Sequence, residues 1–341
     1  MMNLRYLFLG CTAALMAACA PAQKDQEFRV LEYNVENLFD CQDDTLKNDE
    51  EFLPESPRSW TPKRFHDKLN KISKVVLAAS GEQVPDLVGL CEVENEYCVQ
   101  QLVGNSPLKD AAYEYAMTNS PDQRGIDVVL LYQPATFRHL GTQTIRIASE
   151  EIERRPTRDI LHVTGRVVTG DTLDVFVCHM PSRSGGEAKS EPYRLFTAGY
   201  LRHAADSVME VRQRPNVIIM GDFNDYPTNR SITDVVGAVK PGKQVEKTRL
   251  YNLMNGKEGG TYRYKGEWGT LDQMIVNGYL LDGNERISVS YEDAEILTYP
   301  FLLEEDDRYG GDVPSRTYWG KKYHGGYSDH LPVLMQMKIK Q

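Results

Sequence analysis

Short apolar stretches, each bounded by polar or turn-forming residues, recur along nearly the whole chain. Runs of this length that are rich in Val, Ile, Leu and aromatic residues are typical of buried or half-buried strands. In the last run, apolar and polar residues alternate, which predicts a strand with one exposed face. The pattern predicts strands at residues 28–34, 86–92, 126–132, 160–168, 172–179, 216–220, 271–276 and 333–339.

Two stretches carry the longer period of amphipathic helices. Thr61 followed by Pro62 is a favoured start, because threonine caps a helix and proline fits its first turn. A second helix is expected at residues 191–212. Strands interleaved with helices predict a mixed sheet system covered by helices, in one domain, with surface loops at 43–58 and 303–322. The apolar face of the first helix consists of Phe65, Leu69, Ile72, Val76 and Ala79.

The N-terminus has the pattern of an export signal. Arg5 precedes a short apolar stretch at 7–16, which is too short for a membrane span. Small residues then precede Cys19, as in bacterial lipoprotein signals. We therefore predict a signal peptide at 1–19 with lipidation of Cys19, a tether at 20–27 and a catalytic domain at 28–341; an ordinary signal cleaved after Ala20 or Ala22 is the alternative. Either signal predicts export, and lipidation would hold the protein at a membrane surface of the cell envelope.

Composition restricts the partners. The chain has 341 residues, a net charge of −10, 26% charged residues and 41% hydrophobic residues. This acidic balance gives no overall basic footprint for nucleic acid, but a bound divalent cation and a local basic rim would still allow a nuclease. Four cysteines follow the signal, with no C-x-x-C metal motif; a Cys41–Cys98 disulfide stays open.

Polar side chains with catalytic chemistry stand at the ends of the predicted strands. Strand ends that pack side by side bring such residues from distant segments into one pocket. Each residue alone has an ordinary explanation, such as a solvated turn, a strand cap or a core histidine. Their joint occurrence is what favours a site. The residues are Asn34, Glu92, His179, Asp222, Asn224, Asp272, Asp329 and His330.

These residue types suit metal-assisted cleavage of phosphate esters. Glu92, with Asn34 and Glu36, offers hard oxygen ligands, which favour Mg²⁺, or Mn²⁺ as the alternative, over Zn²⁺. Asp222 is suited to orient and deprotonate a water molecule. Asn224 and His330 can donate to phosphoryl oxygens, with Asp272 holding His330 cationic and in the correct tautomer.

Six segments resemble the endonuclease/exonuclease/phosphatase superfamily, which includes secreted nucleases, abasic-site endonucleases, inositol polyphosphate phosphatases and sphingomyelinases. The resemblance implies an α/β four-layered sandwich, in which two mixed, mostly antiparallel sheets pack face to face with helices outside. The segments are 33–39 (YNVENLF), 90–93 (LCEV), 179–182 (HMPS), 221–224 (GDFN), 271–275 (LDQMI) and 328–333 (SDHLPV).

The resemblance also implies roles for individual residues. Glu92 would bind the metal, assisted by Asn34 and Asp329. Asp222 would activate water, and His330 with Asp272 would stabilise the transition state. Where many members carry an acidic residue two places after the first asparagine, this chain has Glu36, which keeps the charge and lengthens the reach. By the same resemblance, Asn224 and His179 would hold the phosphate.

Candidate substrate contacts are weaker signals. Arg124 and Arg183 lie in loops near the motifs, and each could equally belong to a turn or a solvated loop. Tyr264 and Trp319 lie in segments that mix aromatic residues with cations, a combination that suits base stacking, lipid headgroups or sugar phosphates. Hairpins with aromatic cross-strand pairs explain these segments equally well.

The sequence thus predicts an exported, monomeric, Mg²⁺-dependent phosphoesterase in which water attacks phosphorus without a covalent intermediate. A nuclease-like phosphodiesterase is the first substrate class, because no apolar hairpin suited to membrane insertion is evident. A phosphomonoesterase acting on sugar or inositol phosphates is the second. A non-catalytic surface protein that binds cations or glycans is the alternative outside enzymes.

Overall fold

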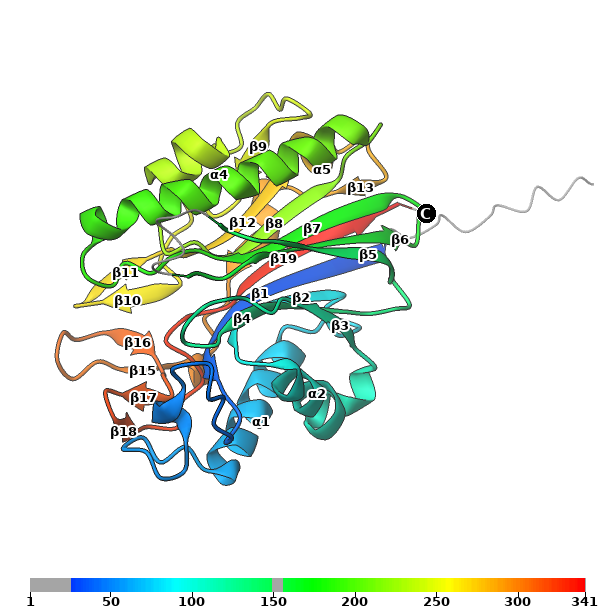
Figure 1. Cartoon of the computed structure of the whole chain (residues 1–341). Helices are drawn as coiled ribbons and strands as arrows, with labels where there is room; N and C mark the ends of the chain where they lie inside the picture. Colours follow the sequence, from blue (N-terminus) through cyan, green and yellow to red (C-terminus); the bar gives the residue numbers. More distant parts are fainter. Residues whose placement is uncertain (1–25, 149–155, 341) are drawn as a thin grey trace, which may run out of the picture.

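Two β-sheets lie face to face, and helices cover their outer surfaces (Figure 1). The computed structural model of the chain describes residues 26–148 and 156–340. The predicted signal peptide and the tether up to residue 25 lie outside this part. Residues 26 and 27, predicted as tether, already belong to the first strand.

The first sheet contains one parallel strand pair. β1 and β2 run parallel, and the other neighbours are antiparallel. The strand order is β13 (Ile287–Ser288), β19 (Val333–Ile339), β1 (Gln26–Leu38), β2 (Leu87–Val93), β4 (Asp127–Tyr132) and β3 (Glu114–Met117), with β14 (Ala294–Ile296) also paired to β19.

The second sheet repeats this design. Among its described strands, β7 and β8 are the one parallel pair. A parallel pair needs a crossover connection, and the long helices α1 (Pro62–Ala78) and α4 (Glu187–Val211) provide the two crossovers. The strand order is β5 (Phe137–Ile145), β6 (Ile160–Val167), β7 (Thr172–His179), β8 (Val217–Asp222), β12 (Asp272–Asn277) and β9 (Leu250–Asn252).

Apolar side chains form a core in each of the three spaces between the four layers. Between the sheets, residues such as Val30, Val175 and Ile218 are buried together. α1 and α2 (Glu96–Asn105) cover the first sheet, where Ile72 is among the buried residues, and α4 covers the second, where Leu201 is buried. Burial of this kind is the main stabilising term of the fold. The predicted four-layered class is therefore confirmed.

Smaller elements decorate this frame. Three two-stranded hairpins lie on one side of the sandwich (Figure 1). They are β10 (Tyr262–Tyr264) with β11 (Glu267–Gly269), β15 (Leu303–Glu305) with β16 (Asp312–Pro314), and β17 (Tyr318–Trp319) with β18 (Lys322–Tyr323). The remaining elements are α5 (Gly278–Leu281), 3₁₀ turns at Glu50–Phe52, Pro107–Ala111, Tyr291–Asp293 and Pro300–Leu302, and a π turn at Ser231–Val236.

Several local predictions need correction. α4 starts at residue 187 rather than 191, so Pro192 lies within its N-terminal part, where its missing N–H leaves one helical hydrogen bond unmade. The first three residues of β19 are all buried, because one face of the strand packs into the core between the sheets and the other into the core beneath α1. The predicted exposed face is therefore limited to the end of the strand. The predicted loop at 303–322 contains β15, β16 and β17.

All four cysteines in the described part are free. Within residues 26–148 and 156–340, no helix has the length and apolarity needed to span a membrane.

Candidate active site

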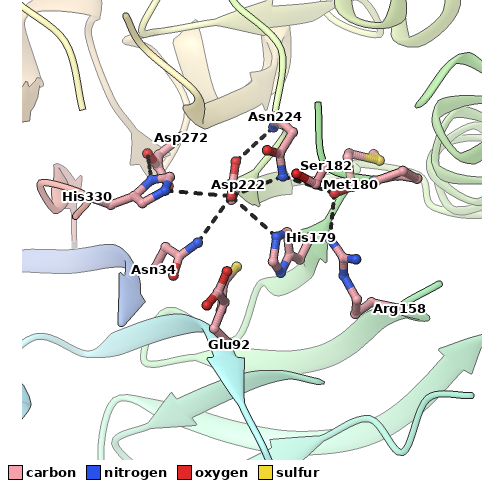
Figure 2. Close-up of polar contacts among 12 residues, drawn as sticks. Asn34, Glu92, Arg158, His179, Met180, Ser182, Asp222, Asn224, Asp272 and His330 are labelled. Atoms are coloured by element: carbon pink, nitrogen blue, oxygen red, sulfur yellow. Dashed lines mark hydrogen bonds and ion pairs between the residues drawn. The ribbon is translucent and has the colours of Figure 1, made fainter. Parts of the chain in front are cut away.

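The strand ends do converge. The first sheet contributes Asn34 and Glu92 from its parallel pair, and His330 from the turn before β19. The second sheet contributes His179 from β7, Asp222 from β8 and Asp272 from β12 (Figure 2). Asp222 is the register partner of both His179 and Asp272 on the two neighbouring strands. Strand register therefore fixes this half of the site. The six segments that carry the sequence motifs meet where the two sheets adjoin.

Asp222 is the centre of the hydrogen-bond network. Its Oδ2 accepts from Asn34 Nδ2 at 3.1 Å and from Asn224 Nδ2 at 3.2 Å, and it lies 3.3 Å from His179 Nε2. Its Oδ1 accepts the backbone N–H of Asn224 at 2.8 Å. Burial alone would raise the pKa of Asp222, but the hydrogen bond from His179 and the charge of His330 hold it well below its usual range. The carboxylate is thus ionised and oriented.

His330 and Asp272 form a buried pair beside Asp222. His330 Nδ1 lies 2.7 Å from Asp272 Oδ2, and its Nε2 lies 4.0 Å from Asp222 Oδ2. Burial lowers the pKa of His330, but the carboxylates of Asp272 and Asp222 raise it well above 6.5 overall. The ring is therefore an imidazolium at neutral pH, with Nε2 available as a donor. The ring of Tyr262 packs on it at 5.0 Å between centroids.

His179 is neutral by contrast. Burial and the neighbouring guanidinium of Arg158 hold the pKa of His179 below 6.5. Its Nε2 faces Asp222, and its buried Nδ1 has no hydrogen-bond partner among the described residues. Two histidines of one site thus differ in charge because carboxylates outweigh burial at His330, whereas burial and Arg158 outweigh the nearby carboxylates at His179.

Glu92 has the properties of a ligand for a hard cation. Its Oε2 accepts from the backbone N–H of Asn37 at 3.0 Å and lies 3.5 Å from Arg124 Nη2, while no partner of its other oxygen is seen in the described residues. Burial raises the pKa of Glu92, but Arg124, His179 and His330 outweigh it and keep the group ionised. An ionised carboxylate beside Asn34 and Asp222 fits Mg²⁺ or Mn²⁺. Asn34 Oδ1 accepts the N–H of Glu36 at 3.0 Å and retains a second lone pair.

A second group could also hold an ion. Asp222, Asp272 and His330 place ligand atoms within 4.8 Å of one another. A histidine binds metal only when neutral, and the Asp272 contact favours the charged ring of His330. The oxygen ligands around Glu92 are therefore the better fit for a hard cation.

Backbone strain is concentrated at this site. Glu36, Asn37, Glu92 and Asn224 have positive φ angles of 52°, 60°, 66° and 49°, and they are four of the seven such non-glycine residues in the described part. Left-handed conformations of this kind cost energy and cluster at functional sites. Gly221 has φ 137°, and a Cβ there would lie 1.8 Å from the carbonyl oxygen of Cys178, so only glycine fits before Asp222.

The carboxylate of Glu36 is already engaged by the segment that precedes Asp329. Its Oε2 accepts the backbone N–H of Thr317 at 2.6 Å, and its Oε1 lies 3.6 Å from Arg316. Burial and the nearby Asp329 raise its pKa to about 7. Lys68 also bonds to Thr317, through Oγ1 at 2.6 Å. Glu36 thus anchors the segment that leads into Asp329 and His330, and its predicted role as a ligand has no support from these contacts.

The other predicted contacts are divided between two cavities. A cavity of about 660 Å³ lies over Asp222 and is lined by Arg124, Arg183, Tyr264 and Asp329, among others. Arg183 is already engaged, since Nε donates to the Asn224 carbonyl at 2.7 Å and Nη2 lies 3.2 Å from Asp225. Trp319 does not line this cavity but a neighbouring one.

Sequence reasoning missed two buried charged residues near the site. Arg158 donates to the carbonyl of Met180 at 2.6 Å and pairs with Asp122 at 3.4 Å, and no motif marks it. Glu32 is fully buried on β1, and neither carboxyl oxygen has a hydrogen-bond partner among the described residues. The alternation of β1 does indicate it, because Val30, Glu32 and Asn34 share one face.

The state of Glu32 gives a stability prediction. Burial, then the charges of Asp272 and Asp222, raise its pKa well above 4.5. Between pH 4.5 and the raised pKa, the folded protein holds a proton that the unfolded chain has released, so this group costs stability as pH rises. We expect Glu32→Gln to remove this loss. The stability of the variant relative to wild type should rise with pH above 4.5, by at most about 1.4 kcal/mol per pH unit.

Denaturant unfolding of both proteins at several pH values, with EDTA present throughout, measures this difference. Glu295→Gln, an exposed glutamate on β14, is the matched control. A difference between Glu32→Gln and wild type that is independent of pH would contradict the assignment of a neutral Glu32.

Comparison with known proteins identifies the family. The profile of the endonuclease/exonuclease/phosphatase family matches residues 29–339. The chain belongs to this family, whose members hydrolyse phosphoesters and are generally metal-dependent. No curated protein sequence is a significant match.

Solved structures share the fold at low sequence identity. A mannosyl-6-phosphatase from Bacteroides thetaiotaomicron matches with a TM-score of 0.56 and 15% identity, over 91% of this chain and 99% of that one. D. rerio TDP2 complexed with a single-strand DNA product matches with 0.55 and 16%, over 92% and 99%. The human Nocturnin catalytic domain with bound sulfate matches with 0.55 and 15%, over 93% and 96%.

Proposed function

We propose that this protein hydrolyses phosphoesters by direct attack of water, with a divalent cation bound at Glu92. The observation that carries the proposal is Asp222. It is a buried, ionised carboxylate held by several hydrogen bonds, and it lies next to a buried imidazolium at the base of a cavity. A fixed acceptor beside a fixed cationic donor is the arrangement that water attack on an anionic ester requires.

The residues of the chain divide the work. Asp222 accepts the proton of the attacking water, and the network from Asn34, Asn224 and His179 fixes its direction. His330 donates from Nε2 to a phosphoryl oxygen as negative charge develops, and Asp272 keeps the ring charged and oriented. Preorganised donors of this kind need no rearrangement at the moment of reaction.

Glu92, Asn34 and Asp329 are the residues that would hold the cation. Their oxygens favour Mg²⁺ or Mn²⁺. A bound cation would neutralise the charge of the phosphate and of its transition state. Asp329 is held by Arg316 at 2.7 Å, which places its carboxylate at the edge of the cavity.

The charges of the cavity favour a small phosphomonoester over a nucleic-acid strand. This reverses the order of the two substrate classes predicted from the sequence. Of the described residues that line this cavity, Arg124 and Arg183 are the arginines, and both are paired with carboxylates of the protein. These two side chains form no continuous basic track for a polyanion. The solved neighbours include both a mannosyl-6-phosphatase and a DNA-bound protein, so they do not distinguish the two substrate classes. The charge of this cavity favours the phosphomonoester.

A phosphoester panel tests the proposal. The purified protein is assayed with phosphorylated sugars, inositol phosphates, oligonucleotides and simple diesters, with EDTA and then with added Mg²⁺ or Mn²⁺. We expect chelation to lower turnover by at least about a hundredfold, and either metal to restore it, because the ester charge is otherwise unshielded.

Protein without substrate and substrate with metal alone are the controls. Hydrolysis that persists in EDTA would contradict the metal requirement. An absence of hydrolysis across the whole panel would support the non-catalytic binding protein instead.

A further inference from the structure

A second, larger cavity adjoins the catalytic one. It measures about 890 Å³, against about 660 Å³ for the cavity over Asp222. Tyr262, Tyr264 and Asp329 line both, so the two cavities meet at these residues. Residues of the hairpins β10–β11, β15–β16 and β17–β18, which lie on the same side of the molecule (Figure 1), line the larger one. Chemistry at Asp222 does not need this space.

The wall of the second cavity is braced. Arg263 on β10 pairs with Asp306 in the β15–β16 loop at 2.9 Å and donates to the carbonyl of Gly310 at 2.6 Å. Asp306 in turn accepts the backbone N–H groups of Arg308 and Tyr309 at 2.9 and 3.0 Å. These contacts hold separate hairpins together, so the cavity is formed before any ligand arrives, which lowers the cost of binding.

Three large aromatic side chains are exposed on this wall. Tyr264 is 60% exposed, and Tyr309 and Trp319 are each 44% exposed. The indole of Trp319 is fixed by a hydrogen bond to Glu304 at 3.2 Å. Exposed rings that are gathered and oriented around a cavity indicate ligand binding rather than core packing.

Aromatic rings can bind either nucleic-acid bases or sugar rings, and the charge of the wall distinguishes between these two kinds of ligand. Arg263 and Arg316 are paired with Asp306 and Asp329. The side-chain carboxylates of Glu305 and Asp307 have no hydrogen-bond or ion-pair partner in the described part of the chain, although the backbone of Glu305 pairs with β16. Among the described residues that line the cavity, five are acidic and four, including Lys265 and Arg308, are basic, and His324 is bonded to Glu304.

This balance opposes a nucleic-acid strand, which needs a positive track along its phosphates. It suits a neutral ligand with many hydroxyl groups. Carboxylates accept hydrogen bonds from hydroxyls, and aromatic faces pack against the C–H faces of sugar rings. The carboxylates of Glu305 and Asp307, together with the face of the Trp319 ring that Arg316 does not cover, provide both kinds of contact.

We propose that the second cavity binds the carbohydrate part of a phosphorylated glycan, whose phosphate enters the catalytic cavity past Asp329. The cleavage of that phosphate rests on the proposed function. Binding of the sugar does not, because the residues that would contact it, Glu305, Asp307 and Trp319, lie outside the Asp222 network.

Binding of neutral sugars is the first test. Mannotriose, cellotriose, maltotriose and triacetylchitotriose are titrated into the full protein, followed by calorimetry and tryptophan fluorescence. We expect at least one to bind with a Kd of about 1 mM or tighter. Trp319→Ala should weaken that binding by at least about tenfold through loss of ring contact, and Trp319→Phe should keep most of it.

Tyr97→Ala is the matched control, since Tyr97 is similarly exposed on α2 and lines neither cavity. It should bind the sugar as wild type does. If none of the trisaccharides binds to wild type at about 20 mM, the inference fails, whatever the protein hydrolyses.

Competition between phosphorylated substrates is the second test. The trisaccharide that binds is phosphorylated at its terminal sugar, and its kcat/KM is compared with that of a 5′-phosphorylated oligonucleotide. We expect the sugar phosphate to be preferred by at least about tenfold, and Trp319→Ala to reduce that preference. A preference for the oligonucleotide that depends on Trp319 would assign the wall to base stacking and overturn the inference. Sugar binding without any hydrolysis would leave the inference standing and refute the proposed function.

Discussion

Asp222→Asn should lower phosphoester turnover by at least about a hundredfold, the usual loss when a general base is removed. The amide cannot take a proton from water. It also disturbs the network, because Oδ2 faces donors from Asn34, Asn224 and His179, and Oδ1 faces the N–H of Asn224. Either orientation of the amide places its NH₂ group against another donor. The measurement is kcat on the best substrate of the panel with saturating metal.

Asp206→Asn is the matched control, since Asp206 is a half-exposed carboxylate on α4 that pairs with Arg202. It should keep wild-type turnover. Circular dichroism and thermal unfolding show whether Asp222→Asn is folded. Turnover close to wild type in a folded Asp222→Asn protein would remove Asp222 from the role of base.

His330→Ala should also lower turnover by at least about a hundredfold, because it removes a charged donor from the developing negative charge.

Asp272→Asn tests the pKa of His330 directly. The Asp272 carboxylate raises the pKa of His330, so its loss lowers that pKa, and His330 then releases its proton at lower pH. The basic limb of the pH profile of kcat should therefore move to lower pH in Asp272→Asn.

Asp282→Asn is the control and should keep the wild-type profile, because Asp282 pairs with Lys247 and follows α5, beyond the end of β12 opposite to Asp272. An Asp272→Asn protein with reduced turnover but an unmoved basic limb would show that Asp272 acts only on packing.

In the double variant Asp222→Asn/His330→Ala, turnover should fall by less than the product of the two single-variant factors, because the effects of residues that act as a unit are not additive.

The sequence was sufficient for the frame of the fold because each layer has its own periodic signal. The buried strands β7, β8 and β12 each contain a short continuous apolar run (VFVC, VIIM and MIV), and the spacing around Ile72 indicates an amphipathic helix. Polar residues at the ends of such strands are conspicuous. Asp222 and His330 could therefore be predicted as neighbours, although 108 positions separate the two in the printed sequence.

The parts that could not be predicted depend on contacts between distant segments. Glu36 looks like a ligand by its place near Asn34, but Thr317 and Arg316, which come from the other end of the chain, take its carboxylate. Arg183 is similar, because Asp225 and the Asn224 carbonyl engage it. The segment around Trp319 reads as a loop, since its strands are two or three residues long and carry no periodic signal.

The division of the site between the two sheets has a practical use. Asn34 and Glu92 lie on one sheet, with His330 in the turn that leads into its strand β19, and His179, Asp222 and Asp272 lie on the other. A small molecule that contacts both sets stabilises the native state against separation of the halves, by an amount that grows with its concentration. A melting-temperature screen of phosphorylated compounds, run on the inactive Asp222→Asn protein so that none is consumed, would therefore find candidate substrates without an assay for their products.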